Sequence, residues 1–492
     1  MHILKGKRMK KTILFFAATL FICIASKAQI DASLFSKKSS FSTGANSASQ
    51  PHTLSCGDID GDGKEDIVVP NSGGNTISVF RNICISGHTF DSTGFASKID
   101  LTVLTTPMMT AVTDVDNDGK QDIVVAHYNS NTLSVFPGSS TVGVISFATR
   151  IDVSASTNPG YLIFADLDGD GKKDMIVSNF GAGTISVFKN TSTSGTISFS
   201  VRVDYNAGNG AALLSAVDLN KDGKKDIIVT NYNGNSFSVF KNNSTVGSLS
   251  FSTAKNITSN GLPNGLDVYD INKDSLPDLA ITNSSYGQIS IFQNVSTIDS
   301  IKFALKFIQP TGSTPQSLLF CDLDNNGIKD LCIVNRLSDS MTVFHIKNGL
   351  TTVDSNFYDT KTTFSIPGGP LALVAADMDN NGSLDLTVTN YATGKITVLT
   401  NKLHTTGTGI NEQIFHTKNV LNVFPNPFGS SINIPLGLNE ILESVIFYDV
   451  CGKLLFTSKE NVIDTKNLSN GTYFIDVKTD KNLYHQKVIK QD

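Results

Sequence analysis

The sequence predicts an all-β protein whose largest part is a ring of seven four-stranded units. An acidic nonapeptide recurs seven times, an apolar run rich in β-branched residues follows each copy, and each period has room for four short strands. The copies start at Asp58, Asp114, Asp166, Asp218, Asp270, Asp322 and Asp377. This is a repeat of roughly 50 residues, a period typical of propellers, solenoids and tandem arrays.

We number these nonapeptides loop 1 to loop 7. Each has the form Asp-x-Asp/Asn-x-Asp/Asn-Gly-x-x-Asp, with Ser replacing Gly in loop 5. The alternate spacing aims the oxygens of positions 1, 3 and 5 at one point, and the Asp at position 9 returns to it. A hard cation that takes about six to eight oxygens, including the backbone carbonyl of position 7, fits such a loop, whereas softer metals prefer His or Cys. We therefore expect Ca²⁺, up to seven ions.

The candidate metal ligands are positions 1, 3, 5, 7 and 9 of every loop. Position 7 contributes only its carbonyl, so its side chain is free to vary. In chain order the candidates are Asp58, Asp60, Asp62, Lys64, Asp66, Asp114, Asp116, Asp118, Lys120, Asp122, Asp166, Asp168, Asp170, Lys172, Asp174, Asp218, Asn220, Asp222, Lys224, Asp226, Asp270, Asn272, Asp274, Leu276, Asp278, Asp322, Asp324, Asn326, Ile328, Asp330, Asp377, Asp379, Asn381, Ser383 and Asp385.

The number of carboxylates ranks the loops by expected affinity. Loops 1, 2 and 3 carry four Asp each and should bind most tightly. Loops 4, 6 and 7 replace one carboxylate by an amide, at Asn220, Asn326 and Asn381. Loop 5 should be weakest, because it has Asn272 for a carboxylate and Ser275 where glycine would relieve a positive φ. We expect a strained or empty site there.

An EF-hand is the alternative interpretation of such a loop. It requires Glu at position 12 and a helix on each side. Position 12 of loop 1 is Val69, and the runs at residues 67–69, 123–125 and 227–229 are β-branched, as in buried strands. A solvated Asp-rich turn would account for one copy, but not for seven in register.

Each period has the pattern of four short strands. In the third period we expect them at residues 160–166, 175–178, 184–188 and 197–203. Four strands in each of seven periods predict a seven-bladed β-propeller, whose closure removes the sheet edges.

The last period lacks one strand, because only residues 386–389 and 395–400 follow loop 7. The segment at residues 40–43 is similar to residues 146–149 and 250–253, which we assign to outer strands. We therefore predict that this N-terminal segment closes the ring.

The loops and the strands around them resemble the FG-GAP repeats, also called VCBS-like repeats, of integrin α-subunit-type propellers. The resemblance covers about residues 36–402, and the namesake motif survives best at Phe180-Gly181. It implies a propeller that engages ligands on the side opposite the acidic loops.

A second module follows a small polar linker. Its strand-rich segments, residues 423–428, 445–449, 468–473 and 487–490, are similar in order and terminal position to the C-terminal sorting domain of the type IX secretion system. That resemblance implies a small β-sandwich that the type IX machinery recognises for export and that is then usually removed. An ordinary Ig-like module is the alternative. The expected organisation is a signal peptide (1–28), the propeller (29–403), a linker (404–417) and the sorting domain (418–492).

The N-terminus has the pattern of a secretory signal peptide: basic residues at 5–11, an apolar run at 13–24 and Ser26-Lys27-Ala28 as a cleavage site. A lipoprotein cleavage box at residues 20–23 is disfavoured because Ile22 is bulky. No later stretch approaches ~20 apolar residues, so we expect no transmembrane segment. We expect a secreted protein, extracellular or on the outer-membrane surface of a Gram-negative bacterium.

Charge and cysteine content narrow the partners. The loops hold 24 of the 44 acidic residues, and loss of the six basic residues of the signal peptide would lower the net charge from −5 to −11. Without a basic patch, nucleic acid is not an expected partner. Cys321 and Cys332 bracket loop 6, and we favour buried free thiols over a disulfide there.

No catalytic constellation is visible, since the eight His are scattered and Trp is absent. The candidate ligand surface is instead the turn after each second strand, which carries Tyr128, Phe180, Tyr232, Arg336 and Tyr391. These residue types suit contact with a protein or a glycan, although local packing of the aromatic rings is the alternative. We favour an adhesin or other binding protein over a structural surface component or a carbohydrate-active enzyme.

Overall fold

The computed structural model describes residues 30, 33–44, 47–85, 90–403, 423, 426, 428–436, 440–448, 454–480 and 483–491. The expected signal peptide and linker lie outside these residues. The chain divides between residues 406 and 407 into two compact units. No helix in the described residues has the length and apolar character needed to cross a membrane, and the one helical segment there is a 3₁₀ turn at Ser47–Ser49.

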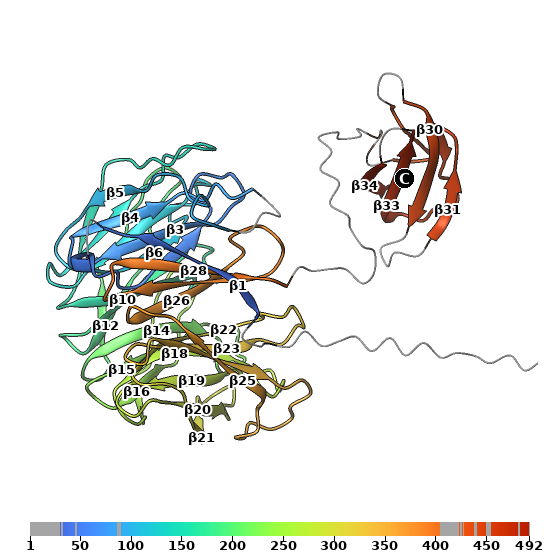
Figure 1. The fold of residues 1–492 in the computed structure, drawn as a ribbon. Helices are drawn as coiled ribbons and strands as arrows, with labels where there is room; N and C mark the ends of the chain where they lie inside the picture. The colour runs from blue at the N-terminus through green and yellow to red at the C-terminus, as the bar shows by residue number, and fades with distance from the viewer. Residues whose placement is uncertain are drawn as a thin grey trace, which may run out of the picture. The chain divides into compact units, whose positions relative to one another are not determined.

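The first unit contains seven antiparallel sheets of four strands each (Figure 1). We number them sheet 1 to sheet 7, so that each loop joins the first two strands of the sheet with the same number. Sheets 1 to 3 are β2 (Ser55–Gly57), β3 (Asp66–Asn71), β4 (Thr76–Phe80) and β5 (Ile99–Thr102); β6 (Pro107–Thr113), β7 (Asp122–His127), β8 (Thr132–Phe136) and β9 (Ile151–Ser154); and β10 (Pro159–Ala165), β11 (Asp174–Asn179), β12 (Thr184–Phe188) and β13 (Val203–Asn206). Sheets 4 and 5 are β14 (Ala211–Val217), β15 (Asp226–Asn231), β16 (Ser236–Phe240) and β17 (Lys255–Thr258); and β18 (Pro263–Tyr269), β19 (Asp278–Asn283), β20 (Gln288–Asn294) and β21 (Phe303–Pro310). Sheets 6 and 7 are β22 (Pro315–Cys321), β23 (Asp330–Asn335), β24 (Ser340–Ile346) and β25 (Tyr358–Ser365); and β26 (Pro370–Ala376), β27 (Asp385–Asn390), β28 (Lys395–Asn401) and β1 (Phe35–Ser42).

The N-terminal strand completes the last sheet, as predicted. β1 runs antiparallel to β28, with Phe41 opposite Ile396 and Ser42 opposite Lys395. The first strands of successive sheets contact one another in order, and β26 of sheet 7 contacts β2 of sheet 1. The contacts between the seven sheets therefore form a closed cycle.

The outer strands were predicted several residues too early in the sequence. Residues 146–149 and 250–253 precede the outer strands β9 and β17 and make only isolated bridges, at Phe147 and Phe251. The strand expected at residues 197–203 likewise begins only at Val203. After the third strand the chain first turns back in a short hairpin, with a bridge between Thr193 and Thr196, so the outer strand starts several residues later.

The second strand of every sheet is buried on both faces, whereas the outer strands β5, β9, β13 and β17 are mostly exposed. Every second strand is buried along its whole length, as its uninterrupted apolar run predicts. The serines that alternate with apolar residues in the third strands are buried too. Ser186, for example, accepts a hydrogen bond from Asn179 Nδ2 at 2.8 Å and donates one to Asp204 at 2.6 Å. Alternation in these strands therefore marks a buried row of polar side chains, such as Ser186, which bonds to neighbouring strands of the same sheet, and not a solvent-exposed face.

The second unit contains a four-stranded sheet, in the order β31-β30-β33-β34, and a two-stranded pair, β29-β32. Apolar side chains from both sheets, including Ile432, Phe447, Ile463 and Ile475, share one core. The strands are β29 (Ser431–Asn433), β30 (Leu442–Tyr448), β31 (Leu454–Ser458), β32 (Val462–Asp464), β33 (Gly471–Thr479) and β34 (Leu483–Lys490).

Candidate functional site

The seven loops fold through the same side-chain hydrogen bonds to their own backbone. In loop 1 the Gly63 N–H donates to Asp58 Oδ2 at 2.9 Å, and the Lys64 N–H donates to Asp62 Oδ1 at 3.1 Å. The six other loops repeat both bonds between the equivalent positions. These bonds are Asx-type turns, so the residue pattern shapes each loop by local chemistry.

The position 9 carboxylate is buried and, in loop 1, joins the loop to the segment directly after the third strand. Asp66 accepts from the Ile59 N–H at 3.0 Å and from the Asn82 N–H at 2.7 Å. Burial nevertheless raises the pKa of Asp66 to about 7 and that of the equivalent Asp385 to about 8. Burial disfavours the ionised carboxylate, and a bound divalent ion would favour it.

The donor sets of four loops fit a hard divalent cation. Three carboxylates lie with one oxygen each within 4.8 Å of one another in loops 1, 2, 3 and 7. In loop 6 the corresponding cluster contains His345 together with Asp324 and Asp330. Oxygen donors at this spacing suit Ca²⁺, which would bridge positions 1, 3, 5 and 9 and offset their mutual repulsion.

Loop 5 is strained at the position that the sequence singled out. Ser275 has φ +69°, where the other loops place glycine, and Lys273 two residues earlier has φ +60°. Non-glycine residues in this left-handed region cost roughly 1 to 2 kcal/mol each. The strain part of the prediction for loop 5 is confirmed, and the low affinity stays a prediction.

Three loops contain a basic side chain that the sequence ranking did not consider. It comes from the residue directly after the third-strand Phe: Arg81 pairs with Asp60 and, at 2.8 Å, with Asp62. Lys189 pairs with Asp168 and Asp170 in loop 3 in the same way, and Lys241 lies 3.3 Å from Asp222 in loop 4. In loop 2 this position is Pro137. We therefore expect loop 2, with four Asp and no such cation, to bind more tightly than loops 1 and 3.

Five asparagines, here called the latch asparagines, each join a loop to the next sheet. Asn242 donates from Nδ2 to Leu167 O in loop 3 and to Lys225 O in its own loop, loop 4, both at 2.8 Å. Asn82 makes the same bond to Met378 O in loop 7 at 2.9 Å, which connects the last loop to sheet 1. The latch asparagines are Asn82, Asn190, Asn242, Asn294 and Asn401.

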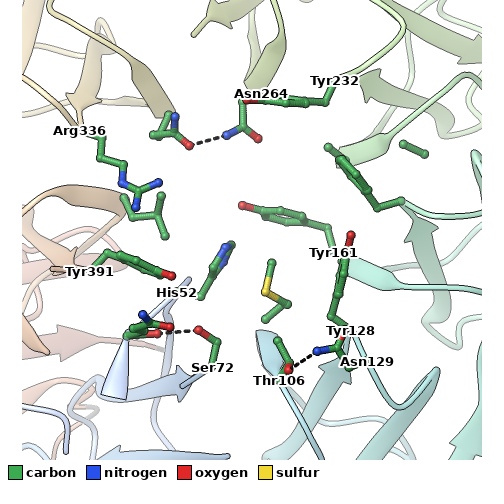
Figure 2. Close-up of a pocket in the computed structure, with 18 residues that line it drawn as sticks. His52, Ser72, Thr106, Tyr128, Asn129, Tyr161, Tyr232, Asn264, Arg336 and Tyr391 are labelled. Carbon is green, nitrogen blue, oxygen red and sulfur yellow. Dashed lines mark hydrogen bonds between the residues drawn. The ribbon is translucent and has the colours of Figure 1, made fainter. Parts of the chain in front are cut away.

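A pocket of about 540 Å³ lies at the opposite end of the second strands. All five residues singled out in the turns line it: Tyr128, Phe180, Tyr232, Arg336 and Tyr391 (Figure 2). Each directly follows the last residue of a second strand, so the fold repeats this position around the pocket. The equivalent Ser284 does not line the pocket. Its hydroxyl instead donates to Pro315 O at 2.7 Å.

A second repeated position, which sequence reasoning missed, also lines this pocket. In each sheet one residue pairs with the last residue of the second strand, as Pro315 pairs with Asn335. The repeated position is the residue directly after it, here Gln316. In six of the seven sheets a proline directly precedes it, and that was the available signal. The seven residues are His52, Met108, Gly160, Ala212, Asn264, Gln316 and Leu371.

The pocket has an aromatic wall and a polar wall. The rings of Tyr128, Phe180 and Tyr232 form a tilted series, with neighbouring centroids 6.1 and 6.2 Å apart. Across the pocket the Arg336 guanidinium lies over the Tyr391 ring, 4.5 Å from its centroid (Figure 2). Between the two walls Asn264 Nδ2 donates to Gln316 Oε1 at 2.7 Å.

Among the described residues that line the pocket, Arg336 alone is charged at neutral pH. Burial, and then the nearby Arg336, lower the pKa of His52 to about 4, so its imidazole is neutral. Burial raises the pKa of Tyr161, which keeps its hydroxyl protonated. No Asp or Glu is among the residues that line the pocket. The pocket is therefore cationic in an acidic protein.

Comparison with known families agrees with this architecture. A sequence model described as FG-GAP-like repeat matches residues 114–177, 166–229, 218–281, 270–333 and 322–388, which together span more than half of the chain. The chain belongs to this family of FG-GAP-like repeat proteins. A model described as Secretion system C-terminal sorting domain matches residues 422–491. This tail implies recognition by the type IX secretion machinery and a secreted or cell-surface location. No curated protein sequence matches the chain.

Several solved structures are similar to the chain. The crystal structure of BBS1N in complex with ARL6DN, soaked with lead, is 11% identical, covers 76% of this chain and 99% of its own, and has a TM-score of 0.50. A protein from Lactobacillus plantarum is 14% identical over 68% of this chain and 98% of its own, with a TM-score of 0.48. The Dos1 propeller is 10% identical over 71% of this chain and 76% of its own, with a TM-score of 0.45. Because so few residues are identical, the likeness to BBS1N concerns the fold alone.

Proposed function

We propose that this chain is a calcium-binding adhesin, exported by the type IX machinery, whose seven sheets are the blades of a seven-bladed β-propeller. The two sheets of the second unit then form the β-sandwich of the sorting domain. In this proposal the acidic loops bind Ca²⁺ and hold neighbouring blades together, while the turns at the other end present the ligand site to a protein or glycan outside the cell.

The observation that carries the proposal is the composition of the pocket. Two positions of the repeat surround it, yet their residues differ from sheet to sheet, whereas the loops at the other end keep one pattern. Concave sites with aromatic walls and a few convergent polar groups are typical of ligand pockets. Three half-buried aromatic rings also lie side by side along one wall, where they offer a ligand a large contact area.

Retention of the mature protein on an array of glycans and cell-surface proteins tests the proposal. We expect Tyr128→Ala, Tyr232→Ala and Tyr391→Ala to abolish retention, because these rings form the pocket wall. We expect Tm to stay unchanged, because each ring is only half-buried. Tyr286→Ala is the matched control: Tyr286 lies in the corresponding turn of sheet 5, is 65% exposed and does not line the pocket. Unchanged retention in all three pocket variants would overturn the proposal, as would depolymerisation of a bound saccharide by the purified protein.

A further inference from the structure

The four arginines in the described residues differ in what they contact. Arg81, Arg150 and Arg202 each pair with an aspartate. Arg336 makes no ion pair within the described residues and lies over the ring of Tyr391. Stacking on an aromatic ring orients a guanidinium while leaving its N–H groups in the guanidinium plane to bind a planar anion. Arg336 is thus a positioned cation whose partner is not supplied by the described part of the chain.

No acidic side chain is among the described residues that line the pocket with Arg336, although the protein is acidic, with 44 acidic residues against 39 basic ones. At the loop end, by contrast, basic side chains lie among carboxylates. A ligand carboxylate in the pocket would therefore meet one oriented guanidinium and no competing negative group, an arrangement that favours a bidentate pair.

The opposite wall provides a surface for the apolar face of a sugar ring. Tyr128, Phe180 and Tyr232 come from three consecutive sheets and are tilted to one another by 52° and 46°, so the rings curve around the pocket. Small inner residues at Gly160 and Ala212 leave room beside them. Aromatic rings pack well against the C–H face of a pyranose, and neutral amides and hydroxyls can bind its hydroxyl groups.

The amide and hydroxyl groups between the two walls are uncharged. Asn264 and Gln316 are hydrogen-bonded to each other, and Asn129 Nδ2 donates a hydrogen bond to Thr106 Oγ1 at 2.7 Å. In Figure 2 the Tyr161 side chain extends toward the middle of the pocket. The uncharged lining therefore suits a ligand that is rich in hydroxyl groups.

We propose that the pocket binds a carboxylate-bearing sugar, such as a uronic acid unit of a glycan, with the carboxylate on Arg336 and the sugar ring against Tyr128, Phe180 and Tyr232. This inference rests on the proposed function and specifies the ligand of the same pocket.

The test is calorimetric titration of the full mature chain, with Ca²⁺ present, using a trisaccharide that ends in glucuronic acid and the methyl ester of the same trisaccharide. The two probes differ only at the carboxyl group, which is an anion in the acid and a neutral methyl ester in the other probe. We expect the acid to bind about tenfold more tightly or better, because a charge-assisted hydrogen bond is stronger than a neutral one. R336Q should remove this preference and R336K should keep part of it, whereas R202Q, which alters an arginine outside the pocket, should leave it unchanged.

Equal binding of acid and ester, or a preference that survives R336Q, would overturn the inference. Carboxylates can also reach the protein through Ca²⁺ in the loops, but such binding would not depend on Arg336 and would persist in R336Q. If only neutral glycans or only peptides bind, and Tyr128→Ala abolishes that binding, the proposed function stands and the carboxylate-sugar inference fails. If neither probe binds and array retention does not depend on the tyrosines, both fail.

Discussion

The residues before the second strands are nearly the same in all seven sheets, whereas the residues directly after these strands differ from sheet to sheet. At one end of β15 the chain enters from loop 4 at Asp226, and the seven loops share nearly the same residues and the same hydrogen bonds. At the other end Asn231 is followed by Tyr232, and the equivalent residue is Ser, Tyr, Phe, Ser, Arg or Tyr in the other sheets. Each sheet needs the same connection to its neighbour, so the loop end is repeated. The turn end has no such requirement, and its side chains are available to bind a ligand.

Removal of the cation should have the largest effect and should act through the loop end alone. Chelation leaves clustered carboxylates without a counter-charge, so we expect Tm to fall by about 10 °C or more and to recover when Ca²⁺ is restored. Scanning calorimetry of the mature chain with and without EDTA measures the change. A chelated protein with unchanged Tm would show that the loops are stable on their own and would remove the basis for treating them as metal sites.

Replacing a latch asparagine should lower the free energy of unfolding more than replacing the asparagine next to it in the sequence. Asn242 is buried and makes three side-chain hydrogen bonds, two of them to carbonyls on either side of the sheet boundary. Asn243 is exposed. We expect Asn242→Ala to lower the free energy of unfolding by about 3 kcal/mol, because it leaves buried groups unpaired, and Asn243→Ala to change it by less than about 0.5 kcal/mol. Urea unfolding of both variants measures the difference, and equal effects would count against the latch.

The smallest expected effect concerns the one loop that departs from the pattern. Ser275→Gly relieves a positive φ but adds flexibility to the unfolded chain, so we expect a net gain of about 0.5 to 1 kcal/mol. Gly327→Ser at the same position of loop 6 should change stability in the opposite direction. Chemical denaturation in Ca²⁺ measures both. A loss of stability in Ser275→Gly would mean that the serine side chain has a role that backbone strain does not describe.

Local patterns and the closure of the last sheet by β1 could be predicted from the sequence, whereas side-chain contacts between elements could not. The loop residues could be predicted because they follow a nine-residue pattern. The turn residues could be predicted because each follows the second strand at the same point in its sheet. Arg81 comes after β4, whereas loop 1 comes before β3, and only the pairing of these two strands brings its side chain to the loop. The outer strands were misplaced because the Ser-Phe segments resemble β1 in sequence while the chain turns back at Thr193 before pairing resumes.

The pocket shows the same limit. Tyr128 and Arg336 were found because the turns are recognisable, but His52, Asn264 and Gln316 share no residue type and no periodic signal except the proline before them. They line one pocket because the first strands of all seven sheets come together around it. This is a property of the closed arrangement of sheets and not of any single repeat.

The central claim is that the loop end stabilises the fold and the turn end binds. Measurement of both Tm and array retention on Asp122→Asn and Tyr232→Ala in saturating Ca²⁺ tests it most directly. We predict that Asp122→Asn, which removes a buried charge of loop 2, lowers Tm by about 2 to 5 °C and keeps retention, whereas Tyr232→Ala keeps Tm and loses retention. If each variant changes both quantities together, the two ends are not separate in function and the account is contradicted.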